Sequence, residues 1–254
     1  MEFDNKIALV TGGSRGLGKN SALRLSKNGI GVIVTYLNNK KEANDVVSEI
    51  EQNGQKAAAL QLDVADIKSF DGFIQQVSEL LNEKWKKDKF DFLINNAGIG
   101  AHAVIEQTTE EIFDSLFNVQ FKGVFFLTQK AIPLIADNGC IVNISSGLTR
   151  FSLPGHSAYA SMKGAIETFT KYLAKELGHK GINANLVAPG AIETDFTRAS
   201  FEDNPQLKEM IASQTALGRV GVPDDIGGVV AFLCSEDARW VNGQRIEASG
   251  GIFL

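Results

Sequence analysis

Tyr159 and Lys163 are the pair of residues best suited to proton chemistry in this chain. They lie four residues apart in a stretch of helical periodicity that begins near Ser157, so both side chains are expected on one helix face. An ammonium group beside a phenol favours the phenolate and is expected to lower the phenol pKa. The same spacing at Tyr36 and Lys40 falls where an expected strand ends and turns. Context therefore favours Tyr159 as the proton-transfer residue.

A glycine-rich run near the N-terminus could bind phosphate. Residues 11–18 (TGGSRGLG) follow an apolar segment and precede a helical pattern. Glycines let the backbone approach an anion closely, and the first turn of a helix directs free N–H groups toward that anion. The run lacks the Lys-Ser/Thr ending of NTP-hydrolysing loops, which favours a dinucleotide over ATP. An ordinary glycine-rich turn between strand and helix is the alternative interpretation.

The elements that must position these residues alternate along the chain. Short apolar segments are separated by longer stretches of helical period, which is typical of parallel βαβ units. We therefore expect an α/β fold, with a Rossmann-like doubly wound parallel sheet in a single domain spanning residues 1–254. Ligands of such sheets bind beyond the carboxyl ends of the strands. The expected strands are 7–11, 31–36, 57–61, 91–95, 139–144, 182–188 and 245–248.

The composition excludes several classes of function. The 254 residues carry a formal net charge of −5 with both signs interspersed, which argues against a nucleic-acid partner. The N-terminal segment has no signal-peptide pattern and no apolar run reaches membrane-spanning length, so we expect a cytoplasmic protein. Cys140 and Cys234 lie in apolar segments and are expected to be buried thiols. The histidines show no metal-ligand spacing and are expected on the surface or in a pocket, without a metal; they are His102, His156 and His179.

Taken together, these motifs resemble the short-chain dehydrogenase/reductase family, in its shorter branch with a Thr-Gly-x-x-x-Gly-x-Gly turn. The resemblance spans essentially the whole chain. It rests on motifs at 11–18, 63–64 and 95–98, on Ser146, on Tyr159 with Lys163, on Pro189-Gly190 with Thr194, and on Gly250-Gly251.

The resemblance implies hydride transfer between nicotinamide and a ketone or secondary alcohol. Tyr159 would act as the general acid or base, and Ser146, thirteen residues earlier, would donate a hydrogen bond to the same substrate oxygen. Lys163 would lower the phenol pKa and bind the nicotinamide ribose. The cofactor-binding residues that the resemblance implies are Gly12, Ser14, Arg15, Gly16, Leu17, Gly18, Tyr36, Asn38, Asp63, Val64, Asn96, Ala97, Gly98, Tyr159, Lys163, Pro189, Gly190, Ile192 and Thr194.

Two positions depart from the family pattern. Alignment on Gly123 places Gln120 where the family has the asparagine of its catalytic set. Asn118 cannot substitute, because two helical residues turn the side chain by about 200°. A water-mediated proton relay through that position would therefore be altered. Ser249 replaces the acidic residue that commonly precedes the final glycine pair.

The residues that follow the second expected strand favour NADP(H) over NAD(H). An acidic residue at that strand end would bind the ribose 2′-hydroxyl and repel a 2′-phosphate, but this chain has Tyr36 there and no carboxylate before Glu42. Arg15 in the glycine turn could pair with a 2′-phosphate. If Arg15 only covers the adenine, NAD(H) stays possible.

Two regions bear on substrate and assembly. Residues 191–219 match the variable lid of the family, and their apolar side chains either line a substrate pocket or pack the lid onto the body: Phe196, Phe201, Leu207, Met210, Ile211 and Leu217. The helices expected near 109–135 and 157–178 have apolar residues on more than one face, including Phe113, Leu116, Phe117, Phe121, Phe125 and Phe126. We therefore expect a homo-oligomer, a tetramer by resemblance.

The sequence predicts an NADP(H)-dependent oxidoreductase that acts on a small-molecule ketone or secondary alcohol. One alternative is a regulatory protein that binds NADP(H) with little or no turnover, which Gln120 mildly favours. Another is a nucleotide-binding transferase on a similar sheet, which would have no need of the Tyr159 and Lys163 pair.

Overall fold

The computed structural model describes residues 5–254, apart from the side chains of Phe196, Ala199, Ser200, Asp203 and Pro205. Residues 1–4, part of the segment expected to lack a signal peptide, lie outside the described residues. A seven-stranded parallel sheet has the order β3-β2-β1-β4-β5-β6-β7. This confirms the doubly wound α/β fold. The strands are β1 (Ile7–Val10), β2 (Gly31–Tyr36), β3 (Ala57–Gln61), β4 (Phe90–Asn95), β5 (Ile135–Ile144), β6 (Asn183–Pro189) and β7 (Arg245–Ala248).

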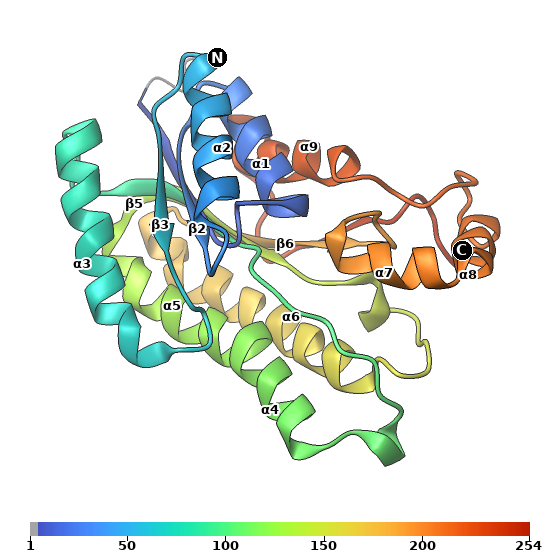
Figure 1. Cartoon of the computed structure of the whole chain (residues 1–254). Coiled ribbons are helices and arrows are strands. Elements are labelled where there is room, and N and C mark those ends of the chain that lie inside the picture. The colour runs from blue at the N-terminus through green and yellow to red at the C-terminus, as the bar shows by residue number, and fades with distance from the viewer. Residues whose placement is uncertain (1–4) are drawn as a thin grey trace.

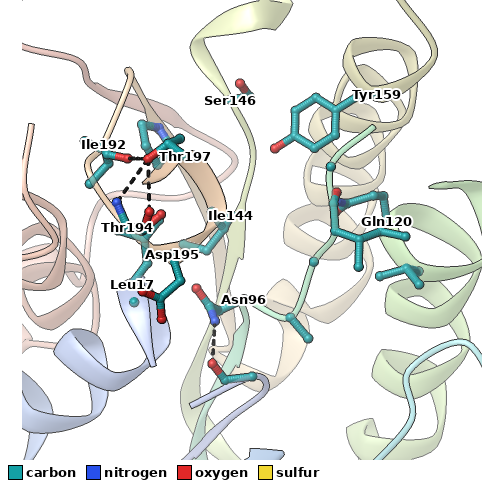
Figure 2. Close-up of a pocket in the computed structure, with 18 of the residues that line it drawn as sticks. Leu17, Asn96, Gln120, Ile144, Ser146, Tyr159, Ile192, Thr194, Asp195 and Thr197 are labelled. Atoms are coloured by element: carbon teal, nitrogen blue, oxygen red, sulfur yellow. Dashed lines mark hydrogen bonds between the residues drawn. The ribbon is translucent and has the colours of Figure 1, made fainter. Parts of the chain in front are cut away.

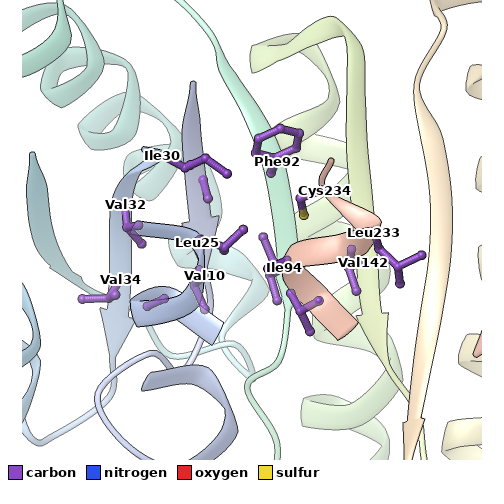
Figure 3. Packing of buried hydrophobic residues seen from close by; sticks show 14 of the residues in the cluster. Val10, Leu25, Ile30, Val32, Val34, Phe92, Ile94, Val142, Leu233 and Cys234 are labelled. Carbon is purple, nitrogen blue, oxygen red and sulfur yellow. The ribbon is translucent and has the colours of Figure 1, made fainter. Parts of the chain in front are cut away.

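Helices cover both faces of the sheet (Figure 1). Along β1, Ala8 and Val10 join one buried apolar cluster, whereas Ile7 and Leu9 join another on the opposite face. The first cluster, part of which Figure 3 shows, draws on α1 (Gly16–Lys27), α2 (Lys40–Gln52) and α9 (Asp224–Leu233). The second draws on α3 (Phe70–Leu80), α5 (Gly123–Ala131) and α6 (Ser157–Leu177). The remaining helices are α4 (Glu110–Phe117), α7 (Asp195–Asp203) and α8 (Pro205–Ser213).

The structure differs from the sequence expectations in two elements. Strand β5 begins at Ile135 rather than 139, because Phe90 pairs with Ile135 ahead of a register shift. The single helix expected near 109–135 is divided into α4 and α5 by a π-helical turn, Asn118–Lys122. At the start of α5, a Cβ on Gly123 would lie 2.0 Å from the carbonyl oxygen of Val64. This close approach of α5 to the loop after β3 is possible only with glycine.

The expected buried thiols are confirmed, since Cys140 and Cys234 are both free and buried. Within the described residues, the helices are all too short or too polar to cross a membrane.

The turn after β1 packs tightly against the end of β4, where the strand order of the sheet reverses. The Thr11 hydroxyl accepts hydrogen bonds from the backbone N–H groups of Asn96 (2.9 Å) and Ala97 (3.0 Å). In return, the Asn96 amide donates to the carbonyl oxygens of Thr11 (2.9 Å) and Gly12 (3.1 Å). Gly12 has a φ of +62°, and a Cβ there would lie 2.9 Å from the Ala97 Cα. The turn is therefore fixed against β4 before any ligand contacts it.

Helix α1 approaches the same turn through Gly18. A Cβ on Gly18 would lie 2.2 Å from the carbonyl oxygen of Gly12 and 2.4 Å from the Asn96 amide nitrogen. Gly18 therefore sets how closely α1 can approach the turn.

We expect Gly18→Ala to destabilise the protein although alanine is the better helix former. Alanine gains up to about 1 kcal/mol over glycine in a helix interior, but here the added methyl group would overlap backbone and cost roughly 1–3 kcal/mol. Gly228→Ala in α9 is the matched control, because a Cβ there has no neighbour within 4 Å. Urea denaturation without nucleotide should show lower stability for Gly18→Ala and equal or higher stability for Gly228→Ala. A stability gain in both variants would contradict the tight packing at Gly18.

Candidate active site

A cavity of about 890 Å³ lies at the carboxyl edge of the sheet. Its walls come from the segments that follow β1 to β6, together with the first turns of α6 and the lid. All of the expected catalytic residues line it: Gln120, Ser146, Tyr159 and Lys163. The expected cofactor-binding residues also line it, with the exception of Gly18, which packs beneath the glycine turn. The structure thus gathers residues from distant parts of the chain at one edge.

The glycine turn and α1 form a cradle for an anion on one side of the cavity. Gly12 and Gly16 have positive φ values of +62° and +56°, which glycine adopts without strain. Arg15, the N-cap of α1, is extended and makes no side-chain cap hydrogen bond, and the first turn of α1 has no acidic residue. The N–H groups and positive dipole end of this twelve-residue helix are therefore available to a phosphate. The cradle fits the pyrophosphate of a dinucleotide.

Tyr159 and Lys163 lie on the first two turns of α6. Lys163 is buried, whereas Tyr159 is partly exposed to the cavity. The Lys163 ammonium lies 5.6 Å from the centre of the Tyr159 ring and donates a 2.8 Å hydrogen bond to the carbonyl oxygen of Ile144. Burial lowers the pKa of Lys163 to about 7. Burial also raises the pKa of Tyr159 to about 12, while a hydrogen bond with Ser146 acts in the opposite direction. Within this chain the phenol is therefore protonated at neutral pH, which is the opposite of the pKa shift expected from the spacing.

The two serines after β5 have different partners. The Ser146 hydroxyl accepts a 3.2 Å hydrogen bond from the backbone N–H of Leu148. Its side chain is also hydrogen-bonded to the Tyr159 phenol. The Ser145 hydroxyl instead donates to the Glu167 carboxylate at 2.9 Å. Figure 2 shows the Tyr159 phenol reaching from α6 toward Ser146 at the end of β5. The geometry thus agrees with the choice of Ser146 over its neighbour.

A charged network that no local sequence pattern predicts lies behind Ser146. Arg245 donates to Glu167 (2.9 Å), to Glu247 (2.7 Å) and to the carbonyl oxygen of Ser146 (3.4 Å). Arg150 pairs with Glu247 and lowers the pKa of that carboxyl to about 2. The network joins the segment after β5, which contains Ser146 and Arg150, to α6 and β7.

Ser249, one of the two departures from the family pattern, belongs to the same network. Its hydroxyl donates a 2.8 Å hydrogen bond to Glu247. An acidic residue at this position would place a second carboxylate beside Glu247. Serine supplies a donor there instead of a like charge.

Gln120 lies on the π-helical turn and its side-chain amide faces Gly98 at the cavity wall. The amide nitrogen donates to the carbonyl oxygen of Ile99. The amide oxygen is buried and has no hydrogen-bond partner among the described residues. The Gln120 side chain is therefore fixed by its amide nitrogen, and its amide oxygen remains available as a hydrogen-bond acceptor.

The adenosine end of the cavity is lined by Tyr36, Asn38 and Arg15, and no acidic side chain follows β2 before Glu42. The Arg15 guanidinium is 59% exposed and lies 4.0 Å from the Asp195 carboxylate of the lid. At this length the ion pair is weak, so the guanidinium is free to turn toward a ligand.

The lid begins directly above the glycine turn. The Thr197 hydroxyl accepts from the Thr194 N–H (3.0 Å) and donates to the Ile192 carbonyl oxygen (2.7 Å), as Figure 2 shows. Of the apolar lid residues named above, Phe201, Leu207 and Ile211 line the cavity, whereas Met210 and Leu217 are exposed. The side chain of Phe196 lies outside the described residues.

The histidines divide between cavity and surface. His102 and His156 line the cavity, and His179 lies on the surface, bonded to the Glu176 carbonyl oxygen. The described part of the chain contains no cluster of three His, Cys, Asp or Glu side chains arranged to hold a metal ion.

Comparison with known proteins places this geometry in a family. Residues 12–252 match the family model described as "Enoyl-(Acyl carrier protein) reductase". The hydroxynaphthalene reductase-like protein Arp2 of Metarhizium brunneum is 38% identical over 258 residues, which cover 97% of this chain and 94% of that protein.

Two solved ketoreductases have similar structures. The promiscuous reductase LugOII, which catalyses keto-reduction at C1 in lugdunomycin biosynthesis, is 36% identical, with a TM-score of 0.94 and full coverage of both chains. The angucycline C-6 ketoreductase LanV, solved with bound NADP, is 37% identical, with a TM-score of 0.94 over 99% of this chain and 96% of that one. With Ser146, Tyr159 and Lys163 assembled beside a dinucleotide cradle, these matches show that the chain belongs to the short-chain dehydrogenase/reductase family and is an oxidoreductase of the carbonyl and alcohol pair.

Proposed function

We propose that this protein reduces a ketone to a secondary alcohol with NADPH, and that Tyr159 is the general acid. The observation that carries the proposal is the protonated phenol of Tyr159 in the cavity, hydrogen-bonded to Ser146 and one helical turn from Lys163, beside the phosphate cradle. A regulatory protein that only binds nucleotide would have no use for a proton donor in this position.

The roles of the side chains follow from their surroundings. Bound NADPH supplies the hydride that the carbonyl carbon receives. Tyr159 donates its proton to the carbonyl oxygen, and its high pKa keeps that proton in place at neutral pH. The Ser146 hydroxyl donates a hydrogen bond to the same oxygen and stabilises the developing negative charge. Lys163 orients the nicotinamide ribose, and the negative charge of the nucleotide favours its ammonium form over the amine.

Gln120 can support the return of the proton to Tyr159 through water. Its buried amide oxygen is an acceptor without a partner among the described residues, and an ordered water is the usual way such an atom is satisfied. The glutamine stem is one methylene longer than that of asparagine, so the water would be displaced by roughly an ångström. We therefore assign Gln120 a supporting role in proton return.

We expect unequal losses when these residues are replaced. Tyr159→Phe removes the general acid, whose contribution is typically about 10²–10⁴-fold, and should abolish nearly all ketone reduction. Gln120→Ala should cost about tenfold or less, and Gln120→Asn should be neutral or mildly improving. The measurement is single-turnover hydride transfer followed by nicotinamide absorbance.

The control for this comparison is the dissociation constant of NADPH, which should be unchanged in both Gln120 variants. Tyr159→Phe is assayed at saturating NADPH, because Tyr159 is also an expected cofactor contact. If Gln120→Ala is as damaging as Tyr159→Phe, then Gln120 contacts the reacting oxygen and the roles must be reassigned. If the wild-type protein binds NADPH but reduces no ketone, the regulatory alternative is favoured.

The preference for NADPH over NADH is also part of the proposal. It is supported by Arg15, by the absence of a carboxylate at Tyr36, and by the NADP bound to LanV. We expect kcat/KM to be at least about tenfold higher with NADPH, the scale of charge-assisted hydrogen bonds to phosphate. Tyr36→Asp should reverse the order, because its carboxylate would bind the 2′-hydroxyl and repel the phosphate.

Arg198 offers a matched control for Arg15. It is an exposed lid arginine that also pairs with Asp195, at 2.6 Å, but it does not line the cavity. Arg15→Ala should weaken NADPH binding while leaving NADH binding nearly unchanged, and Arg198→Ala should change neither. Equal or better kinetics with NADH in the wild-type protein would refute the role of Arg15.

Polycyclic aromatic ketones are the first substrates to test. The name of one similar protein refers to hydroxynaphthalene, a bicyclic aromatic compound, and that of another to keto-reduction of an angucycline. The substrate side of the cavity is apolar, with contributions from Phe151, Phe201 and Ile252.

We also propose a homo-oligomer, a tetramer by family resemblance. Leu116 and Phe126 are part of the monomer's interior, but Phe113 is 44% exposed and Tyr172 is 62% exposed on α4 and α6. An aromatic cluster of Phe117, Phe121, Phe125 and Phe169 extends from α4 through the π-helical turn and α5 to α6. Light scattering at micromolar concentration should give a multiple of the monomer mass, and a monomer mass would reject the proposal. The cytoplasmic location stays a prediction from the sequence.

A further inference from the structure

Two histidines form a polar site in the otherwise apolar substrate side of the cavity. His102 comes from the loop after β4, and His156 is the residue that precedes α6. Their ring centres lie 5.3 Å apart at an angle of 82°, and both side chains line the cavity. Within residues 5–254, no described group forms a hydrogen bond with either imidazole. The polar edges of this pair are therefore available to a ligand.

The position of this pair is fixed by the backbone around Gly155. A Cβ on Gly155 would lie 2.2 Å from the His102 Nε2, and its φ of +86° also favours glycine. The Ala103 N–H donates to the Gly155 carbonyl oxygen at 2.9 Å, which joins the two loops. The His156 side chain makes no cap hydrogen bond to α6, so it has no role at the start of that helix. The structure thus packs His102 against Gly155, and neither imidazole uses its nitrogens in a hydrogen bond with the described residues.

The chemistry of the pair suits a neutral oxygen. The pKa of His156 is lowered mainly by partial burial and to a smaller extent by the neighbouring His102. Its ring is therefore uncharged at neutral pH and offers one donor and one acceptor. The charged residues that line the cavity are Arg15, Asp63, Lys163 and Asp195, and we assign all four to the nucleotide side or the lid. A carboxylate or phosphate on the substrate would therefore find no cation near the histidines.

We infer that His102 and His156 bind a second oxygen of the substrate, a hydroxyl or carbonyl group carried on the same ring system as the ketone. This inference rests on the proposed ketone reduction and names the substrate class, oxygenated polycyclic aromatic ketones. His156 is the N-cap residue of α6 and Tyr159 lies in the first turn of that helix, so both side chains enter the cavity from the same helix end. The apolar walls are formed by Phe151 and Phe201. The ring centre of Phe151 lies 4.8 Å from that of Phe253.

The test compares 1-tetralone with its 5-, 6- and 7-hydroxy derivatives. The wild-type protein should reduce at least one hydroxy derivative with a kcat/KM about tenfold higher than that of 1-tetralone, because one net hydrogen bond to the substrate discriminates on this scale. His156→Phe and His102→Phe keep an aromatic ring but remove its nitrogens. They should abolish this preference and leave the kcat/KM for 1-tetralone within about threefold of wild type. His156→Asn, which restores a donor and an acceptor, should recover part of the preference.

Binding separates failure of this inference from failure of the proposed function. Dissociation constants of the same tetralones for the complex with NADP⁺ should show the same hydroxyl preference, and its loss in His156→Phe, whether or not turnover occurs. The dissociation constant of NADPH reports that the variants are folded. Reduction of 1-tetralone without any preference for a hydroxy derivative, or a preference that survives in both phenylalanine variants, would overturn the inference while ketone reduction stands. Binding that depends on His156 without turnover would support the inference and refute the proposed function.

Discussion

The contact between the turn after β1 and the end of β4 is the constraint on which the rest of the site depends. Thr11 and Asn96 exchange hydrogen bonds across this contact, and Gly12 brings the two backbones to a distance that no other residue allows without displacement. Strand order reverses here, so the loops on either side diverge and leave room for a ligand between them. Helix α1 is positioned from the same contact through Gly18. The anion cradle therefore takes its position from this contact.

Burial dominates the electrostatics at the reacting end of the cavity. Desolvation favours the neutral form of both Tyr159 and Lys163, so the phenol pKa rises while the amine pKa falls. The charges of the network behind Ser146 are arranged differently. Arg150, Arg245, Glu167 and Glu247 neutralise one another. The result is an uncharged proton donor next to a loop that is braced by ion pairs.

Hydrophobic periodicity was sufficient to predict the seven strands and their parallel arrangement. The βα rule then placed Tyr36, Asn96 and Ser146 at one edge, where the structure has them. The prediction was wrong about the sign of the Tyr159 pKa shift, because spacing on a helix shows which charge is near but not how much water the fold removes. The early start of β5 depends on a register shift against Phe90, which leaves no periodic signal.

The charged network was missed for a related reason. Arg245 meets Glu167 across 78 residues of sequence, and no local pattern links them. Gln120 was identified only through its departure from the family pattern, and its unsatisfied amide oxygen became visible only in the structure. Pairings between distant segments and the degree of burial are thus the properties that a single sequence does not encode in its local patterns.

Phe201 and Ile211 of the lid pack with Val220, directly after it, and with Ile252 near the C-terminus, in a small apolar cluster separate from the two clusters on the faces of the sheet. Phe201, Ile211 and Ile252 also line the cavity, so the side chains that shape the substrate wall are those that anchor the lid to the C-terminal segment. Substitutions in this cluster can therefore be compensated locally, without repacking the sheet. These residues are therefore suitable positions for directed evolution of new substrate ranges. Residues of the cluster that contact one another would be varied together, while the nucleotide-binding residues are kept unchanged.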